Sequence, residues 1–318
     1  MKSRNTGFLA MAAAALFLTV QPANAQDIPE SADPIKLPIN EWTGQHITAH
    51  IAGDLLQKLG YSVEYVTAGT VPQYTALSQG ELHFQPEVWT NNLGDIYPKA
   101  VEAGDLVVLG DLGITPRESW IYPPYMEEKC PGLPNYEALY DCAQAFADAS
   151  TFPKGRLITY PADWGQRSRD LVEMIDLPFE PVPGGSEGAM IAELKAALAN
   201  KAPILMMFWE PHWFFAEEKM NWVTWDGAPT DCTFEGQTRG NACGFEATRV
   251  EKTVSSIVPD KWPAAYRFMK AFTIDNDIQS ALMFEVDQQK RPLETVVGEW
   301  IENNEAVWGP WIAAAKGD

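Results

Sequence analysis

The chain has 318 residues, with 43 acidic and 23 basic side chains and a formal net charge of −20. Because proteins bind nucleic acids and anionic membranes through Lys and Arg, this charge balance excludes both as partners. A chain of this length exceeds the usual size of one hydrophobic core, so it predicts two lobes.

The N-terminus has the three parts of a secretory signal. Lys2 and Arg4 provide a positive start, residues 8–20 form an apolar stretch, and residues 23–25 (Ala-Asn-Ala) offer small side chains for cleavage. The apolar stretch is shorter than the ~20 residues that span a membrane. We therefore expect a signal peptide over residues 1–25 and a mature protein in the periplasm.

Four cysteines point to the same compartment. Cys130 and Cys142 lie twelve residues apart, and Cys232 and Cys243 lie eleven apart. Four cysteines allow three pairings, of which the two local pairs are the simplest. A zinc site is disfavoured because the chain has no C-x-x-C knuckle. Two disulfides fit an oxidising compartment.

The predicted elements alternate between strand and helix in two similar units. The first unit has strands at 35–39, 61–66 and 82–88 and helices at 47–59 and 74–77. The second has strands at 157–160 and 204–208 and helices through 171–174 and 190–198, and amphipathic helices follow at 263–272 and 293–312. This order is typical of an α/β fold with parallel sheets covered by helices.

No low-complexity linker separates the two units, which favours lobes joined by short crossing strands. We expect lobe one to comprise residues 27–120 and 226–318, and lobe two residues 121–225. The chain is expected to act as a monomer without a cofactor.

Tryptophans occupy informative positions in these units. Trp42, Trp89, Trp164 and Trp209 each follow a predicted strand, and open α/β sheets bind ligands at the carboxyl ends of their strands. A cage of indole faces suits a methylated ammonium group, whose bulk is apolar and whose charge is positive. Gly165 follows Trp164 at a predicted helix start, where free backbone N–H groups would meet an anionic end of the ligand.

Three segments carry a family resemblance: residues 88–90 (Val-Trp-Thr), 163–165 (Asp-Trp-Gly) and 208–213 (Phe-Trp-Glu-Pro-His-Trp). They resemble the tryptophan motifs of the glycine betaine and proline betaine binding proteins of ABC importers, and the resemblance runs over nearly the whole mature chain. It implies a two-lobed, hinge-closing periplasmic-binding-protein fold of type II. It also implies an aromatic box of Trp89, Trp164 and Trp209, and a membrane permease as partner.

The chain departs from that family at two positions. Betaine binders often have a histidine four residues after the first box tryptophan, where this chain has Leu93, and a cysteine after the Trp-Gly pair, where it has Gln166. Both changes favour trimethylamine N-oxide or choline over glycine betaine. Trp42 and Trp120 are expected to add aromatic walls. Glu41, Glu128 or Glu210 is expected to approach a cation or a hydroxyl of the ligand.

A secreted serine hydrolase is the alternative hypothesis, because residues 184–188 (Gly-Gly-Ser-Glu-Gly) match the G-x-S-x-G nucleophile elbow. His212 alone follows Ser186 as a base, and Glu210 is too near it to orient the ring. A helix cap by Ser186 explains the motif better.

Two metal sites are further hypotheses, one for zinc and one for calcium. His46 and His50 have the spacing of zinc ligands on a helix but lack the H-E-x-x-H glutamate. The acidic loop from Asp226 to Glu235 offers oxygens for calcium without EF-hand spacing, so solvated surface is the preferred interpretation.

Overall fold

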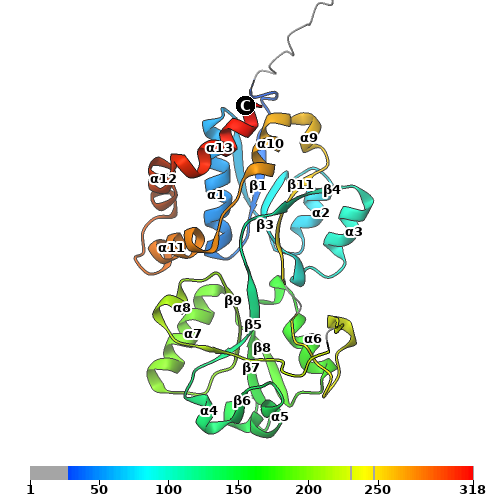
Figure 1. The fold of residues 1–318 in the computed structure, drawn as a ribbon, viewed down its shortest axis with the longest axis vertical. Coiled ribbons are helices and arrows are strands. Elements are labelled where there is room, and N and C mark those ends of the chain that lie inside the picture. Colours follow the sequence, from blue (N-terminus) through cyan, green and yellow to red (C-terminus); the bar gives the residue numbers. More distant parts are fainter. Residues whose placement is uncertain (1–27, 230, 246–247, 318) are drawn as a thin grey trace, which may run out of the picture.

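The computed structural model describes residues 28–229, 231–245 and 248–317, which form two lobes (Figure 1). The predicted signal peptide, residues 1–25, lies outside the described residues. Within these ranges, no helix combines the length and the apolar character that a membrane crossing requires.

Lobe one is built on a mixed arrangement of five strands. β1 and β2 pair in parallel, and β11 pairs antiparallel with both β3 and β4. These pairings form a two-stranded and a three-stranded sheet. The N–H of His83, the residue before β3, donates to the Lys36 carbonyl of β1 at 2.9 Å, so the two sheets continue each other. The spatial order is therefore β2-β1-β3-β11-β4, with bounds Ile35–Ile39 (β1), Val63–Thr67 (β2), Phe84–Trp89 (β3), Leu106–Asp111 (β4) and Val250–Ser255 (β11).

Lobe two repeats that topology. Its sheet has the order β10-β5-β9-β7-β8, which matches lobe one when it is followed from β8 to β10. The bounds are Arg117–Tyr122 (β5), Gly155–Thr159 (β7), Phe179–Pro183 (β8), Met206–Glu210 (β9) and Asn221–Trp222 (β10), and a short β6 (Pro131–Pro134) lies apart. In each sheet the fourth position belongs to a strand that enters from the other lobe, β11 in lobe one and β5 in lobe two.

Helices cover both sheets (Figure 1). Lobe one carries α1 (Thr43–Lys58), α2 (Gln73–Ser78), α3 (Ile96–Ala103), α9 (Val258–Lys261), α10 (Pro263–Ala271), α11 (Asn276–Asp287), α12 (Leu293–Asn303) and α13 (Glu305–Lys316). Lobe two carries α4 (Met126–Lys129), α5 (Ala138–Cys142), α6 (Arg167–Met174), α7 (Glu187–Asn200) and α8 (Phe214–Glu217). In α1, apolar residues at helical spacing (Ile47, Ile51 and Leu55) are fully buried in the core.

The sheets differ from the prediction because they are mixed rather than parallel. The strand that crosses from the other lobe arrives antiparallel to its neighbours, and a sequence pattern carries no information on strand direction.

The lobe boundaries also differ. β5 pairs with β9 of lobe two from Arg117 onwards, and Trp225 and Phe245 pack on Trp120. The chain thus crosses before β5 and again just before β11, not at residues 120 and 226.

The two local disulfides are present. Cys130 is bonded to Cys142 and Cys232 to Cys243, with Cα–Cα distances of 5.3 and 6.1 Å. The first closes the loop around β6, and the second closes the acidic loop of lobe two. The predicted pairing is confirmed.

Candidate ligand-binding site

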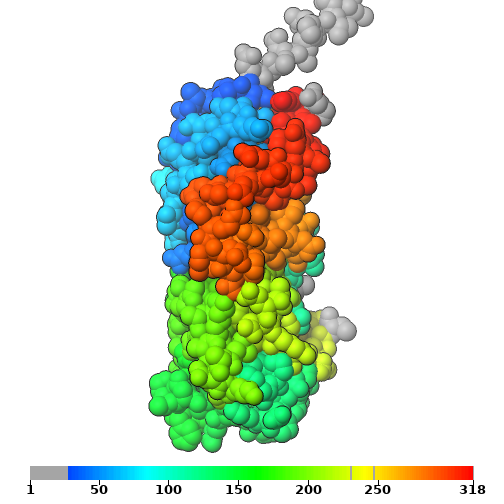
Figure 2. All heavy atoms as spheres, turned by 90° about the vertical axis from the view of Figure 1, so that its left-hand side faces the viewer, coloured from blue at the N-terminus to red at the C-terminus, as the bar shows by residue number. Residues whose placement is uncertain are grey.

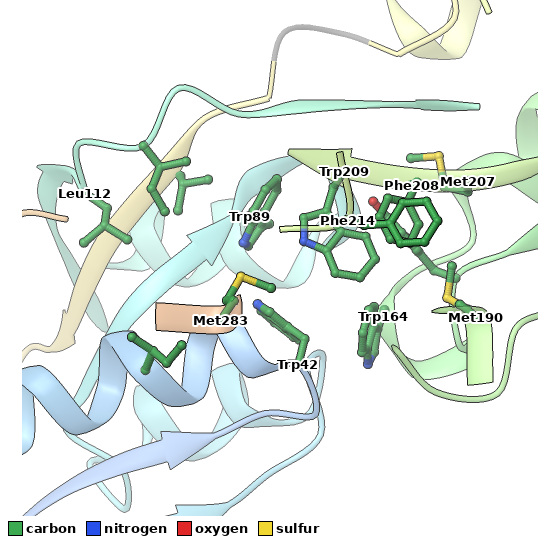
Figure 3. Packing of buried hydrophobic residues seen from close by; sticks show 14 of the residues in the cluster. Trp42, Trp89, Leu112, Trp164, Met190, Met207, Phe208, Trp209, Phe214 and Met283 are labelled. Carbon is green, nitrogen blue, oxygen red and sulfur yellow. The ribbon is translucent and has the colours of Figure 1, made fainter. Parts of the chain in front are cut away.

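A cavity lies between the lobes, at the ends of strands from both sheets. Trp42 follows β1, Trp89 ends β3, Trp164 follows β7 in a short 3-10 helix, and Trp209 lies near the end of β9. β7 has in lobe two the position that β1 has in lobe one, and β9 has that of β3, so equivalent strands of the two lobes each contribute one indole. Figure 3 shows the four rings gathered around one space.

Edge contacts hold these rings at steep angles. The centroids of Trp42 and Trp164 lie 5.1 Å apart at 64°, and those of Trp164 and Trp209 lie 5.7 Å apart at 76°. Tyr160 adds a fifth ring, 5.8 Å from Trp164 and 5.6 Å from Trp209. Tilted rings enclose a space, whereas stacked rings would fill it. All five side chains are buried.

Polar side chains complete the wall beside the aromatic rings. The full wall has eight residues from lobe one and four from lobe two: Trp42, Thr70, Gln73, Tyr74, Glu87, Trp89, Asn92 and Leu93, and Glu118, Tyr160, Trp164 and Trp209. Two of these residues are glutamates. The described residues of the wall include no Lys, Arg or His, so its charged groups are the two carboxylates, beside aromatic faces and a few neutral side chains.

Glu118 joins the two crossing segments of the hinge. Its Oε1 accepts hydrogen bonds from Asn92 Nδ2 and the Tyr160 hydroxyl, both at 2.9 Å, and its Oε2 accepts one from the Thr248 hydroxyl at 2.7 Å. Burial raises the pKa of this carboxyl, and the three hydrogen bonds and the charge of Arg167 act against that rise. A buried carboxyl with a raised pKa is suited to exist in its protonated form as well as its charged one.

The lobes are closed over the cavity. Asn92 reaches Glu118 across the gap, and Arg167 Nη1 donates to the Asn91 carbonyl at 2.9 Å. Gly165 has a φ of +118°, and a Cβ there would lie 2.7 Å from the Asn92 oxygen. A side chain at residue 165 would therefore hold the lobes apart. In Figure 2, the orange α11 meets the green surface of lobe two with no opening on that face.

A second set of contacts bridges the lobes beside α11. The Thr43 N–H donates to Glu187 Oε2 at 2.8 Å, and Trp213 Nε1 donates to Asp287 Oδ2 at 2.8 Å. His212 Nε2 lies 3.2 Å from Glu187 Oε1. Burial raises the pKa of Asp287, and the charge of Glu187 raises it further. We call Thr43, Glu187, Trp213 and Asp287 the interlobe latch, because its hydrogen bonds require the closed arrangement.

Five predicted site residues lie away from the cavity. Trp120 is fully buried within lobe two and donates to the Ser168 hydroxyl at 3.0 Å. It cannot form a cage wall because the segment that carries Trp225 and Phe245 covers it. Gly165 forms the lobe contact described above instead of lining the wall. The three predicted carboxylates lie at the surface or near it: Glu41, Glu128 and Glu210.

The sequence analysis missed seven wall residues, of which Glu87, Glu118 and Tyr160 matter most for the chemistry of the cavity; the others are Thr70, Gln73, Tyr74 and Asn92. Glu87 lies inside β3, in which all six residues are buried, and Glu118 begins the equally buried part of β5. A carboxylate inside such a run is rarely tolerated without partners. That anomaly was the available signal. Leu93, which replaces the family histidine, does line the cavity.

The G-x-S-x-G turn is not a nucleophile elbow. Ser186 is the N-cap of α7, and its Oγ accepts a hydrogen bond from the Ala189 N–H at 3.2 Å. His212 contacts Glu187 and not Ser186. The hydrolase hypothesis is therefore wrong, and the preferred helix-cap interpretation accounts for the motif.

The two histidines predicted as metal ligands make other contacts in the structure. His50 stacks on Tyr65 with 4.0 Å between ring centroids, and His46 Nε2 contacts the Asn40 carbonyl. Across residues 28–229, 231–245 and 248–317, no three His, Cys, Asp or Glu side chains come close enough to hold a metal ion.

Comparison with known proteins agrees with this geometry. Residues 33–303 match the family described as the substrate binding domain of the ABC-type glycine betaine transport system. The chain belongs to this family. It is therefore the solute-binding component of an ABC transporter and not an enzyme. A curated relative, the trimethylamine N-oxide-binding protein of Pelagibacter ubique, is 27% identical over 310 residues, covering 95% of this chain and 98% of that protein.

Solved structures of the family share the fold. The glycine/betaine/L-proline-binding protein of Borrelia burgdorferi is 19% identical, with a TM-score of 0.74 over 90% of this chain and 99% of its own. A choline-binding protein in complex with choline is 16% identical, with a TM-score of 0.73 over 91% of this chain and 99% of its own. The predicted two-lobed type II periplasmic-binding-protein fold is confirmed.

Proposed function

We propose that this protein is a periplasmic receptor that binds trimethylamine N-oxide and delivers it to a membrane permease. One observation carries the proposal: the cavity wall combines a cage of indoles with two buried glutamates and, among its described residues, no basic side chain. Such a wall suits a trimethylammonium group and does not suit a free carboxylate.

The indole faces account for the methylated nitrogen. Trp42, Trp89, Trp164 and Trp209 are each at most 9% exposed. A cation over a desolvated indole gains about 2 kcal/mol or more, and a methylated nitrogen has no N–H that would need a hydrogen-bond acceptor. The N-methyl groups also bury apolar area against the rings.

The polar end of the solute decides between the candidates. The carboxylate of glycine betaine would approach Glu87 and Glu118 without a basic partner in the wall, which is unfavourable at low dielectric. An N-oxide oxygen is smaller and only accepts hydrogen bonds. The Thr70 hydroxyl is buried and has no partner among the described residues, so it is available as a donor. Burial also raises the pKa of Glu118, so its protonated form, which would donate to the N-oxide oxygen, is reached more easily than in an exposed carboxyl.

The relatives support this assignment. The Pelagibacter protein is named for trimethylamine N-oxide and spans nearly the whole chain, and a structural neighbour was solved with choline. The disulfides and the N-terminal segment with the pattern of a signal peptide support export to the periplasm.

Titration of the purified mature protein tests the proposal. Tryptophan fluorescence should report saturable binding of trimethylamine N-oxide, with choline at least about tenfold weaker and glycine betaine weaker still. Tighter binding of glycine betaine than of trimethylamine N-oxide would contradict the argument from the acidic wall. Absence of binding to all three solutes would refute the cage itself.

A further inference from the structure

Glu87 lies behind the cage, in the centre of a strand whose six residues are all buried. Glu87 as a whole is only 1% exposed. An isolated carboxylate in such a place costs several kcal/mol, so its retention requires an unusual set of partners. Those partners include two walls of the ligand cavity.

Four donors converge on this carboxylate. Oε1 accepts the indole N–H of Trp42 at 2.8 Å and that of Trp89 at 2.9 Å. Oε2 is contacted by the Thr48 hydroxyl at 2.8 Å and by Gln279 Nε2 at 2.7 Å. An indole N–H can only donate, so Oε1 faces two obligate donors. Burial raises the pKa of Glu87, and the four hydrogen bonds oppose that rise.

One shared oxygen has a geometric consequence. Because Trp42 and Trp89 donate to the same atom, the angle between the two lobe-one walls is set before any ligand enters. The lobe-two wall differs, since Trp164 Nε1 has no hydrogen-bond partner in the described part of the chain. Lobe one therefore holds a preorganised half of the cage, onto which lobe two closes, and preorganisation reduces the entropy lost on binding.

The shared oxygen also has an electrostatic consequence. Donation from an indole N–H to an anion shifts electron density onto the ring and strengthens the negative face that attracts a cation. The carboxylate adds its own attraction through a medium of low dielectric. A neutral molecule of the same shape gains neither contribution.

We propose that Glu87 is a positioning residue that orients both lobe-one indoles and provides the charge by which the cage selects a cation over a neutral molecule of equal shape. This inference rests on the proposed binding of a methylated ammonium solute. It differs from a purely structural role, which would affect all ligands alike.

Two ligands and two variants separate the roles. Choline and 3,3-dimethylbutan-1-ol have the same shape, and only choline is charged, so the ratio of their dissociation constants measures selection for charge. Glu87→Gln keeps an oxygen for the indoles and removes the charge, whereas Glu87→Asp keeps the charge and shortens the side chain. Glu41→Gln is the matched control, because it removes an exposed carboxylate away from the cavity.

We expect Glu87→Gln to reduce the selection ratio about tenfold, and Glu87→Asp to keep it while both ligands bind more weakly. Glu41→Gln should change neither. An unchanged ratio in folded Glu87→Gln, with both affinities lowered equally or not at all, would overturn the proposal. If circular dichroism shows that Glu87→Gln does not fold, a lost ratio in folded Glu87→Asp overturns it, and a retained ratio supports it. Failure of the wild-type protein to bind any methylated ammonium compound refutes the proposed function instead.

Discussion

The interlobe latch allows the closing equilibrium to be perturbed without touching the cavity. Trp213→Phe retains an aromatic ring and removes the N–H that donates to Asp287 at 2.8 Å. A hydrogen bond to a charged group contributes about 1.5–3 kcal/mol, and we take the lower end because Asp287 is only half-buried and remains bonded to Thr43. Since the bond exists only in the closed state, its loss weakens closure and ligand affinity by about tenfold.

Trp308→Phe is the matched control for this experiment. Trp308 Nε1 donates to the Ile301 carbonyl at 2.8 Å, and both residues lie in lobe one. This variant should lower the free energy of unfolding while ligand affinity stays within about twofold of the wild type. Calorimetric titration with trimethylamine N-oxide measures the affinity, and small-angle X-ray scattering with and without ligand measures closure. Equal losses of affinity in both variants, or none in Trp213→Phe, would refute the latch.

Further predictions concern Trp209 and Glu118 in the cavity wall and the buried His83 of lobe one. Trp209→Ala should weaken trimethylamine N-oxide binding by about thirtyfold, the equivalent of one desolvated cation–π contact, as measured by calorimetric titration. Glu118→Gln should retain trimethylamine N-oxide binding and lose choline binding, because the amide can donate but carries no charge. In the wild type, the affinity for trimethylamine N-oxide should fall and that for choline should rise as pH rises through the raised pKa of Glu118. If Glu118→Gln shows the same pH dependence, the Glu118 carboxyl is not its cause. Burial lowers the pKa of His83 to about 4 in the folded protein, against about 6.5 in the unfolded chain. The stability that the neutral His83 side chain contributes is therefore present above about pH 6.5 and is lost as pH falls toward 4. Urea unfolding across that range should show the loss in the wild type and not in His83→Gln.

The sequence was sufficient for features that depend on local pattern. Strands and helices followed from apolar spacing, and residues 35–39 were predicted with the bounds that β1 has. The positions of Trp42, Trp89, Trp164 and Trp209 at strand ends also follow from local order, because a parallel α/β unit brings such ends to one edge of the sheet.

The exchange of strands between the lobes could not be predicted from a local sequence pattern. β5 and β11 each leave one lobe and join the sheet of the other, antiparallel to their neighbours. The sequence signal of a buried strand is the same for either direction and either lobe, so the crossing points were displaced from residues 120 and 226. Pairing between distant segments decides them.

The carboxylates show the same division most clearly. The sequence predicted that indoles form the site, and it suggested Glu41, Glu128 and Glu210 as its carboxylates. Only the tertiary structure brings Glu87 and Glu118 to the cavity. A buried carboxylate is stable where donors from several elements converge, as Trp42, Thr48 and Gln279 do on Glu87. Their separation along the chain hides that convergence from any local pattern, and the folded chain alone creates it.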